Sequence, residues 1–257
     1  MTPGSVWLAG GGPGDPGLLT VAAVAALAQA DAVVHDALID PRVFALARPD
    51  ATLELAGKRG GRPSALQDDI SDRLIALARA GRRVLRLKGG DPLVFGRGGE
   101  EAFALARAGI PFRLLPGVTA GLAGLAAAGI PATLRGVNQA IVLATGHDPE
   151  GGLDWAALAR LDQPIVLYMA RRSVGAIARA MLSGGIDAEM PAAIVTAATT
   201  VRQRVAVTTL RGLQAAAASV PEADPAIVVI GRIVAARASL AALLAQAEQR
   251  RAWLLPA

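Results

Sequence analysis

The 257-residue sequence contains no cysteine, which excludes disulfide scaffolds, thiolate metal sites and cysteine nucleophiles. Aromatic residues make up only 3% of the chain, so the stacking platforms that bind single-stranded nucleic acid are scarce. No Gly-x-Ser-x-Gly elbow of a serine hydrolase occurs. The two histidines, His35 and His147, lack the spaced His, Cys or carboxylate neighbours of a metal site, so we expect no metal.

Lysine is almost absent as well, because only Lys58 and Lys88 occur among the 26 basic residues. The formal net charge is +5, but the longest basic clusters are pairs of adjacent arginines such as Arg82-Arg83. A nucleic-acid-binding protein would gather its cations into a patch or stripe. The dispersed arginines therefore favour an acidic small-molecule substrate, although a basic nucleic-acid-binding protein remains one alternative.

One long uncharged segment, residues 114–134, is long enough to cross a bilayer. Its glycines and prolines favour instead a buried helix that begins near Thr119 and ends at Gly129. The N-terminus lacks the basic and apolar regions of a secretory signal. We therefore expect a cytoplasmic protein that does not contact a membrane.

Short β-branched runs alternate with alanine- and leucine-rich stretches, a pattern typical of an α/β protein. A first group of strands is expected at 6–9, 32–35, 52–55, 83–87 and 112–115, with helices at 20–29, 71–79 and 100–108. A second group is expected at 140–144, 165–169, 193–196, 205–209 and 227–230, with helices near 174–182 and 235–249. The pattern predicts two α/β domains, 1–133 and 134–257, with a ligand cleft between them.

The first strand ends in a glycine-rich loop, residues 10–17, that contains the G-x-G-x-x-G spacing of dinucleotide-binding folds. Asp36 follows at the end of the second strand, so a nicotinamide-dependent oxidoreductase is one alternative. However, Asp15 would place a carboxylate where pyrophosphate should lie, and Pro13 and Pro16 lack the backbone N–H donors of a phosphate loop. The loop therefore indicates a ligand that need not be an anion.

A second loop, residues 88–101, combines five glycines with two cations and three carboxylates. Glycines allow a ligand to lie directly against the backbone. Asp91 can accept hydrogen bonds from a ribose hydroxyl or from a cationic amine. Two glycine-rich strand ends in one domain indicate a binding site at that edge of the sheet.

Taken in order, these segments resemble the uroporphyrinogen-III C-methyltransferases, part of the wider tetrapyrrole (class III) methyltransferase family: VWLAGGGPGDPGLLT, HDALI, GKRGG, RLKGGDPLVFGRGGEE, LLPGVTAGLAGLAAAGIP and TGH. The resemblance runs from about Val6 to Ile233. It implies two α/β domains of tetrapyrrole methylase type with S-adenosylmethionine in the cleft between them, S-adenosylhomocysteine as the released product, and a homodimer. The N-terminal domain would carry the glycine-rich loops and the substrate cleft, and the C-terminal domain would complete the cofactor site.

The implied reaction is methylation of uroporphyrinogen III at ring positions 2 and 7 to give precorrin-2, a precursor in cobalamin and sirohaem (porphyrin) biosynthesis. Another precorrin methyltransferase of the corrin pathway is the nearest alternative. The resemblance implies that Asp36 is the proton acceptor and Lys58 the proton donor. It also implies cofactor contacts from Pro13, Gly89, Gly90, Asp91, Val94, Thr119, Ala120, Met169, Ala198 and Ala226.

The implied substrate carries many acetate and propionate groups, so the protein should hold arginines that grip carboxylates in pairs of hydrogen bonds. The candidate substrate-binding residues are Arg59, Arg62, Arg97 and Arg135. The chain departs from the family at one place, because Leu134 precedes Arg135 where the family often has histidine.

Overall fold

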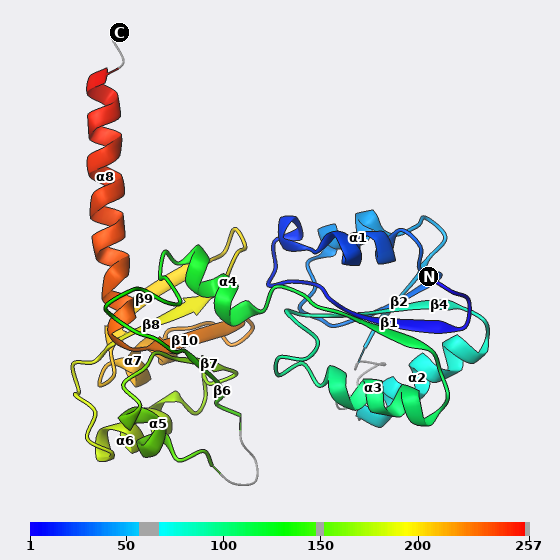
Figure 1. Cartoon of the computed structure of the whole chain (residues 1–257), viewed down its shortest axis with the longest axis horizontal. Coiled ribbons are helices and arrows are strands. Elements are labelled where there is room, and N and C mark those ends of the chain that lie inside the picture. The colour runs from blue at the N-terminus through cyan, green and yellow to red at the C-terminus, as the bar shows by residue number, and fades with distance from the viewer. Residues whose placement is uncertain (57–66, 148–151, 255–257) are drawn as a thin grey trace. The chain divides into compact units, whose positions relative to one another are not determined.

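The computed structural model describes residues 1–56, 67–147 and 152–254 (Figure 1). The chain divides into two compact units, Met1–Ala120 (unit 1) and Gly121–Ala257 (unit 2). Each unit contains its own five-stranded sheet with helices packed on it, so the α/β class expected from the alternating pattern is confirmed.

The boundary between the units falls after Ala120, the first residue of the apolar helix α4 (Ala120–Ala127), whereas the sequence placed the domain boundary after residue 133. The difference arises because α4 packs on the sheet of unit 2. A Cβ added to Gly124 would lie 3.4 Å from the Cβ of Ala198 and 3.8 Å from Cγ1 of Ile227. The roles assigned to the two domains stay predictions.

The sheet of unit 1 contains only parallel strand pairs. The strand order is β3-β2-β4-β1-β5. The strands are β1 (Ser5–Gly10), β2 (Ala32–His35), β3 (Thr52–Leu55), β4 (Arg83–Lys88) and β5 (Phe112–Leu115). Parallel strands point the same way, so the loops that follow β1, β2, β4 and β5 all leave from one edge, where open α/β sheets bind ligands.

Helices cover both faces of this sheet, as Figure 1 shows. One face is covered by α1 (Val21–Leu27) and two short 3-10 segments, η1 (Pro16–Leu18) and η2 (Pro41–Leu46); the other is covered by α2 (Gln67–Arg79) and α3 (Gly98–Arg107). Successive side chains of β4 alternate between the faces, with Leu85 on the α1 side and Val84 on the α2–α3 side. Burial on both faces explains why β1 and β2 are apolar almost throughout, whereas the middle strand β4 also carries Arg83, Arg86 and Lys88.

An ion pair joins the start of β4 to the residue before β2, at the amino edge of the sheet. The Arg83 guanidinium donates to the Asp31 carboxylate at 2.6 and 3.0 Å, and the Arg83 backbone N–H donates at 2.8 Å. These hydrogen bonds hold the pKa of Asp31 well below its ordinary value of 3.8. A depressed folded-state pKa stabilises the fold above the unfolded pKa, and this stabilisation is lost as the pH falls below that value.

Asp31→Asn is therefore expected to lower Tm at pH 7 by roughly 2–4 °C, which corresponds to about 1 kcal/mol in a chain of this length. The difference from wild type should shrink as the pH falls below the ordinary carboxyl value of 3.8. Asp50→Asn is the matched control, because Asp50 binds Arg48 but its side chain is 67% exposed. A Tm loss that is the same at pH 7 and pH 3, or equal in both variants, would contradict this assignment.

The sheet of unit 2 is mixed, in the order β6-β7-β10-β8-β9. Its strands are β6 (Val142–Thr145), β7 (Ile165–Tyr168), β8 (Pro191–Thr196), β9 (Arg204–Thr209) and β10 (Ala226–Ile230). Strand β10 runs antiparallel to both of its neighbours, β7 and β8. The end of β7, the end of β8 and the start of β10 therefore lie at the same edge.

One face of this sheet carries α5 (Trp155–Arg160), α6 (Val174–Ser183) and α7 (Leu213–Ala218). The short 3-10 segment η3 (Arg232–Ala235) follows β10 and leads into α8 (Ala236–Leu254), which continues well beyond the sheet of its unit (Figure 1). Within the residues that the structure describes, no helix combines the length and the apolar character needed to span a bilayer.

Candidate functional site

Three glycine-containing loops meet at the carboxyl edge of the unit 1 sheet. Gly12, after β1, and Gly90, after β4, exchange backbone hydrogen bonds of 3.2 and 2.7 Å. A Cβ added to Gly117, after β5, would lie 2.3 Å from the carbonyl oxygen of Gly90 and 2.7 Å from the Cα of Gly10. The loops touch backbone to backbone, an approach that only residues without a side chain permit.

This edge gathers the cofactor-binding residues predicted in unit 1. Pro13 directly follows the bridging Gly12, and Gly89 directly precedes Gly90. A Cβ on Gly90 would lie 3.5 Å from the backbone nitrogen of Ala120 and 3.8 Å from the Cα of Thr119. The structure therefore places predicted contacts from three separate loops next to one another.

Asp91 joins two of these loops. Its Oδ2 accepts a hydrogen bond from the Gly117 N–H at 2.9 Å, and its Oδ1 accepts one from the Leu93 N–H at 2.8 Å. Each carboxylate oxygen has a further lone pair. Asp91 is thus held in place and can still accept a hydrogen bond from a ribose hydroxyl or an amine.

The rest of the second loop contains strained backbone. Phe95 and Arg97 adopt left-handed conformations, with φ of 54° and 58°. Such strain in residues other than glycine gathers at functional sites. Val94, a predicted cofactor contact, precedes this strained turn and is half-buried.

Arg97, a predicted substrate-binding residue, is paired with Glu100. The Arg97 Nη2 lies 2.6 Å from Glu100 Oε2, and both side chains are more than half exposed. Their hydrogen bonds raise the pKa of Arg97 and lower the pKa of Glu100 from their ordinary values. Arg135 lies in unit 2, exposed in the segment after α4, so the structure does not place these two arginines in one unit. Lys58, Arg59 and Arg62 lie outside the described residues.

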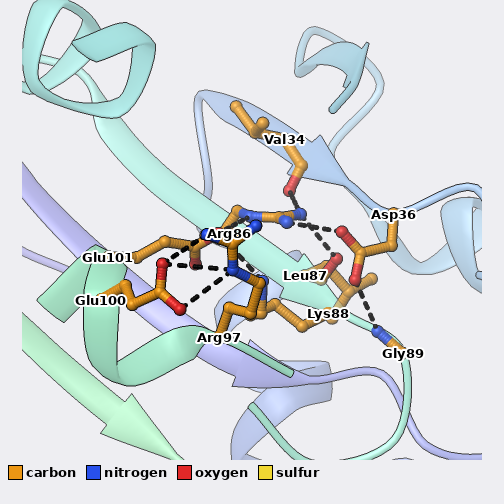
Figure 2. A network of polar contacts seen from close by, with 9 residues as sticks. All are labelled: Val34, Asp36, Arg86, Leu87, Lys88, Gly89, Arg97, Glu100 and Glu101. Atoms are coloured by element: carbon orange, nitrogen blue, oxygen red, sulfur yellow. Dashed lines mark hydrogen bonds and ion pairs between the residues drawn. The ribbon is translucent and has the colours of Figure 1, made fainter. Parts of the chain in front are cut away.

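Asp36 lies directly after β2, at the same carboxyl edge, as the sequence predicted. Figure 2 shows its carboxylate between two partners: the Arg86 guanidinium donates to Oδ1 at 2.5 Å, and the Gly89 N–H donates to Oδ2 at 3.1 Å. The side chain is 32% exposed, so it stays accessible from the edge of the sheet.

The sequence analysis missed the buried part of this network. Arg86 Nε and Lys88 Nζ both donate to Oε1 of Glu101, at 3.1 and 2.9 Å, and all three side chains are almost completely buried (Figure 2). Burial lowers the pKa of Lys88, and the Arg86 charge lowers it further, while Glu101 opposes both effects. The available signal was the alternation in β4, which puts Arg86 and Lys88 on the same face as Val84.

The predicted cofactor contacts in unit 2 also share one edge. In the pairing of β10, Ala226 stands opposite Thr196 and Ile227 opposite Tyr168, so Ala226 lies beside the ends of both neighbouring strands. Met169 follows β7, and Ala198 lies two residues beyond β8. The edge is strained, because Met169, Ala197 and Thr199 have φ of 53°, 45° and 65°.

An open cavity of ≈490 Å³ lies at this edge of unit 2. Met169 and Ala226 line it together with His147, Arg171 and Arg172. Glu222 and Asp224 line it too, and Glu222 pairs with Arg171 and Arg172 at 3.2 and 2.5 Å, so the charged part of the lining is of mixed sign.

The geometry of the first loop weakens the dinucleotide interpretation. Asp15 Oδ1 accepts the Gly17 N–H at 2.8 Å, so a side chain of the protein uses a donor that a phosphate would need. Asp36, which would have to bind a ribose, is engaged by Arg86 and Gly89. Among the described residues, no group of three or more His, Asp or Glu side chains lies close enough together to hold a metal ion.

The two α/β units, with glycine-rich loops in contact at a parallel-sheet edge, define a ligand-binding α/β protein. Comparison with known families makes the assignment specific, because the model of the tetrapyrrole (corrin/porphyrin) methylases matches residues 5–214. The chain belongs to this family, as the resemblance in its motifs predicted.

Individual relatives agree. The chain is 54% identical over 241 residues to a uroporphyrinogen-III C-methyltransferase of Sinorhizobium sp, covering 92% of this chain and 86% of the relative. It is 45% identical to a sirohaem synthase of Chromobacterium violaceum, of which it spans only half the length. A Thermus thermophilus uroporphyrin-III C-methyltransferase, crystallised with S-adenosylhomocysteine, superposes with a TM-score of 0.77 at 38% identity, covering 90% of this chain and 98% of that one.

Proposed function

We propose that the protein is an S-adenosylmethionine-dependent uroporphyrinogen-III C-methyltransferase, which methylates ring positions 2 and 7 and forms precorrin-2. One observation carries the proposal: the glycine-containing loops after β1, β4 and β5 contact one another through their backbones at the carboxyl edge of unit 1. The chain that contains them belongs to the tetrapyrrole methylase family. The 54% identity to a methyltransferase of this name supports this substrate over a later precorrin.

The residues present fit the methyl donor. Glycine backbone at Gly89 and Gly90 leaves room for a ligand against the loop, and Asp91 offers carboxylate oxygens to its hydroxyl or ammonium groups. We propose that Pro13, Val94, Thr119 and Ala120 complete the contacts in unit 1, and that Met169, Ala198 and Ala226 contribute those in unit 2. When bound, S-adenosylmethionine supplies an electrophilic methyl group.

The protein must also accept a proton. Each methylated pyrrole carbon already carries a side chain and becomes quaternary, so the alkylated ring must afterwards lose a proton from another position. We propose that the Asp36 carboxylate accepts this proton and that Lys58 acts as the proton donor. Asp36 suits the role because it is an accessible carboxylate at the binding edge, adjacent to Gly89. The nucleophile is the substrate's own π-system, so the protein needs no cysteine or serine nucleophile.

The arginines bind the substrate carboxylates in this proposal. Arg97 and Arg135 are exposed, and Arg59 and Arg62 are the further candidates. Glu100 accepts hydrogen bonds from Nε and Nη2 of Arg97, so a substrate carboxylate would bind through Nη1.

Arg97→Ala is expected to raise the KM for uroporphyrinogen III about 10-fold or more, since a charge-assisted pair contributes roughly 1.5–3 kcal/mol. The KM for S-adenosylmethionine should change far less. Steady-state kinetics with each substrate varied in turn measures both constants. Arg42→Ala is the control, because Arg42 is an exposed arginine in an equivalent local pair with Asp40. Equal increases in the two KM values would count against a substrate role for Arg97.

The direct test incubates the purified protein with uroporphyrinogen III and methyl-labelled S-adenosylmethionine. Two labelled methyl groups per product, with the chromophore of precorrin-2, are expected. Labelling of a later precorrin but not of uroporphyrinogen III would favour the alternative substrate. No labelling of either would refute the proposal.

We further propose a cytoplasmic homodimer that binds neither nucleic acid nor membrane. The dispersed basic residues support the first exclusion, and many arginines are already paired with carboxylates of the same chain, including Arg42, Arg73, Arg83 and Arg232. Light scattering during size exclusion tests the dimer, and titration with duplex DNA tests the absence of nucleic-acid binding.

A further inference from the structure

A buried cluster of charged side chains holds the carboxylate of Asp36 in place. It contains two cations, Arg86 and Lys88, and two carboxylates, Asp36 and Glu101, so its formal charges balance. Replacing buried ion pairs by apolar residues often leaves a protein equally or more stable. Stability therefore does not explain why β4 carries two charged side chains on the face that elsewhere packs Val84 and Leu105.

Arg86 is fixed on every side. Its Nε donates to Glu101, and its Nη1 lies 3.3 and 3.4 Å from the carbonyl oxygens of Leu87 and Val34. The remaining Nη2 is directed at Asp36, as Figure 2 shows. A guanidinium whose other donors are engaged inside the core cannot change rotamer without losing several hydrogen bonds.

Glu101 supplies the fixed end of this arrangement. It lies in the first turn of α3, where the helix dipole favours a negative charge, and its side chain is completely buried. Because Lys88 donates to the same oxygen, the carboxylate is held from two directions. The packing of α3 on the sheet therefore fixes Glu101, and Glu101 in turn fixes the Arg86 guanidinium.

We propose that Arg86, anchored by Glu101, is a positioning residue that fixes one rotamer of the Asp36 carboxylate at the binding edge. Asp36 follows a strand and is partly exposed, so the Gly89 N–H alone would leave its side chain free to rotate. The inference rests on the proposed function, in which Asp36 accepts the proton from the methylated ring. The Arg86 side chain is only 2% exposed, so in this proposal it acts through Asp36 instead of binding a ligand itself.

A double-mutant cycle on kcat tests the proposal with Arg86→Lys, Asp36→Asn and the double variant. Arg86→Lys keeps the positive charge but cannot engage Glu101 and Asp36 together. It should lower kcat about 10-fold in the wild-type background and have almost no further effect beside Asp36→Asn. The Kd for S-adenosylhomocysteine, measured by calorimetry, should stay within about 3-fold of the wild-type value. A change of this size lies at the low end of the coupling energies between residues in direct contact.

Arg83→Lys is the matched control. It makes the same chemical change on the same strand, in a pair with Asp31 at the opposite edge of the sheet. It should lower Tm slightly and leave kcat unchanged. If Arg86→Lys does not fold, as judged by circular dichroism, the same cycle is run with Glu101→Gln, which keeps the shape of the anchor and removes its charge.

Unchanged kcat in folded Arg86→Lys, or losses that multiply in the double variant, would overturn the inference, since a purely structural residue gives independent effects. A loss confined to S-adenosylhomocysteine binding would overturn it too. Failure of the proposed function is distinguishable, because the wild-type protein would then not methylate uroporphyrinogen III at all.

Discussion

Asp36→Asn should lower kcat for methylation of uroporphyrinogen III by about 10²–10⁴-fold, the usual contribution of a general base. The amide is nearly isosteric and can still accept the Gly89 N–H, which the carboxylate accepts at 3.1 Å. It loses the negative charge that faces Arg86 and the capacity to take a proton. Single-turnover kinetics with both substrates saturating measures the chemical steps directly.

Asp31→Asn is the control for this experiment. It removes a carboxylate from the other end of the same strand pair, where Asp31 binds Arg83 rather than the binding edge. It should retain wild-type kcat, and both variants should bind S-adenosylhomocysteine. If Asp36→Asn turns over at the wild-type rate, Asp36 has no part in the chemistry.

Gly117→Ala should disrupt the binding edge of unit 1. The new Cβ would lie 2.3 Å from the carbonyl oxygen of Gly90 and 2.7 Å from the Cα of Gly10. Both are backbone atoms, so the loops must separate instead of a side chain turning away. Displacement of about 1 Å can cost about 10²-fold in rate, and we expect a loss of at least this size in kcat/KM for S-adenosylmethionine.

Gly99→Ala is the matched control for Gly117→Ala. Gly99 lies in the first turn of α3, and an added Cβ would have no atom within 4 Å. Alanine also favours the helix over glycine, so Tm should stay the same or rise slightly. Equal losses of kcat/KM in the two variants would show that the contact of the three loops does not matter.

The strands were predictable where a short, mostly apolar run stands between polar, proline-containing or glycine-rich segments. The predicted ranges 32–35, 52–55 and 112–115 coincide with β2, β3 and β5. The helices α5 and α7 were not predicted, because six residues give too little periodicity and α7 is mostly alanine. A usable signal existed for α5, since Asp154 caps it by accepting the Ala157 N–H.

The site was predictable to the extent that parallel strands bring their ends together. Asp36 and the glycine loops after β1 and β4 are found by that rule alone. The Arg86–Glu101 pair was not, because it depends on how α3 lies against the sheet. The sequence does not distinguish Arg86 from the other dispersed arginines. The structure shows that Arg86 is buried, and a buried charge needs a partner.

Calorimetric titration with S-adenosylhomocysteine tests the central claim most directly, namely that the strand-end loops form the site for the methyl donor. The account predicts saturable heat from the wild-type protein, markedly weaker binding by Gly117→Ala, and no heat from NADH. Absence of binding by the folded wild-type protein, or equal affinity in wild type and Gly117→Ala, would contradict it.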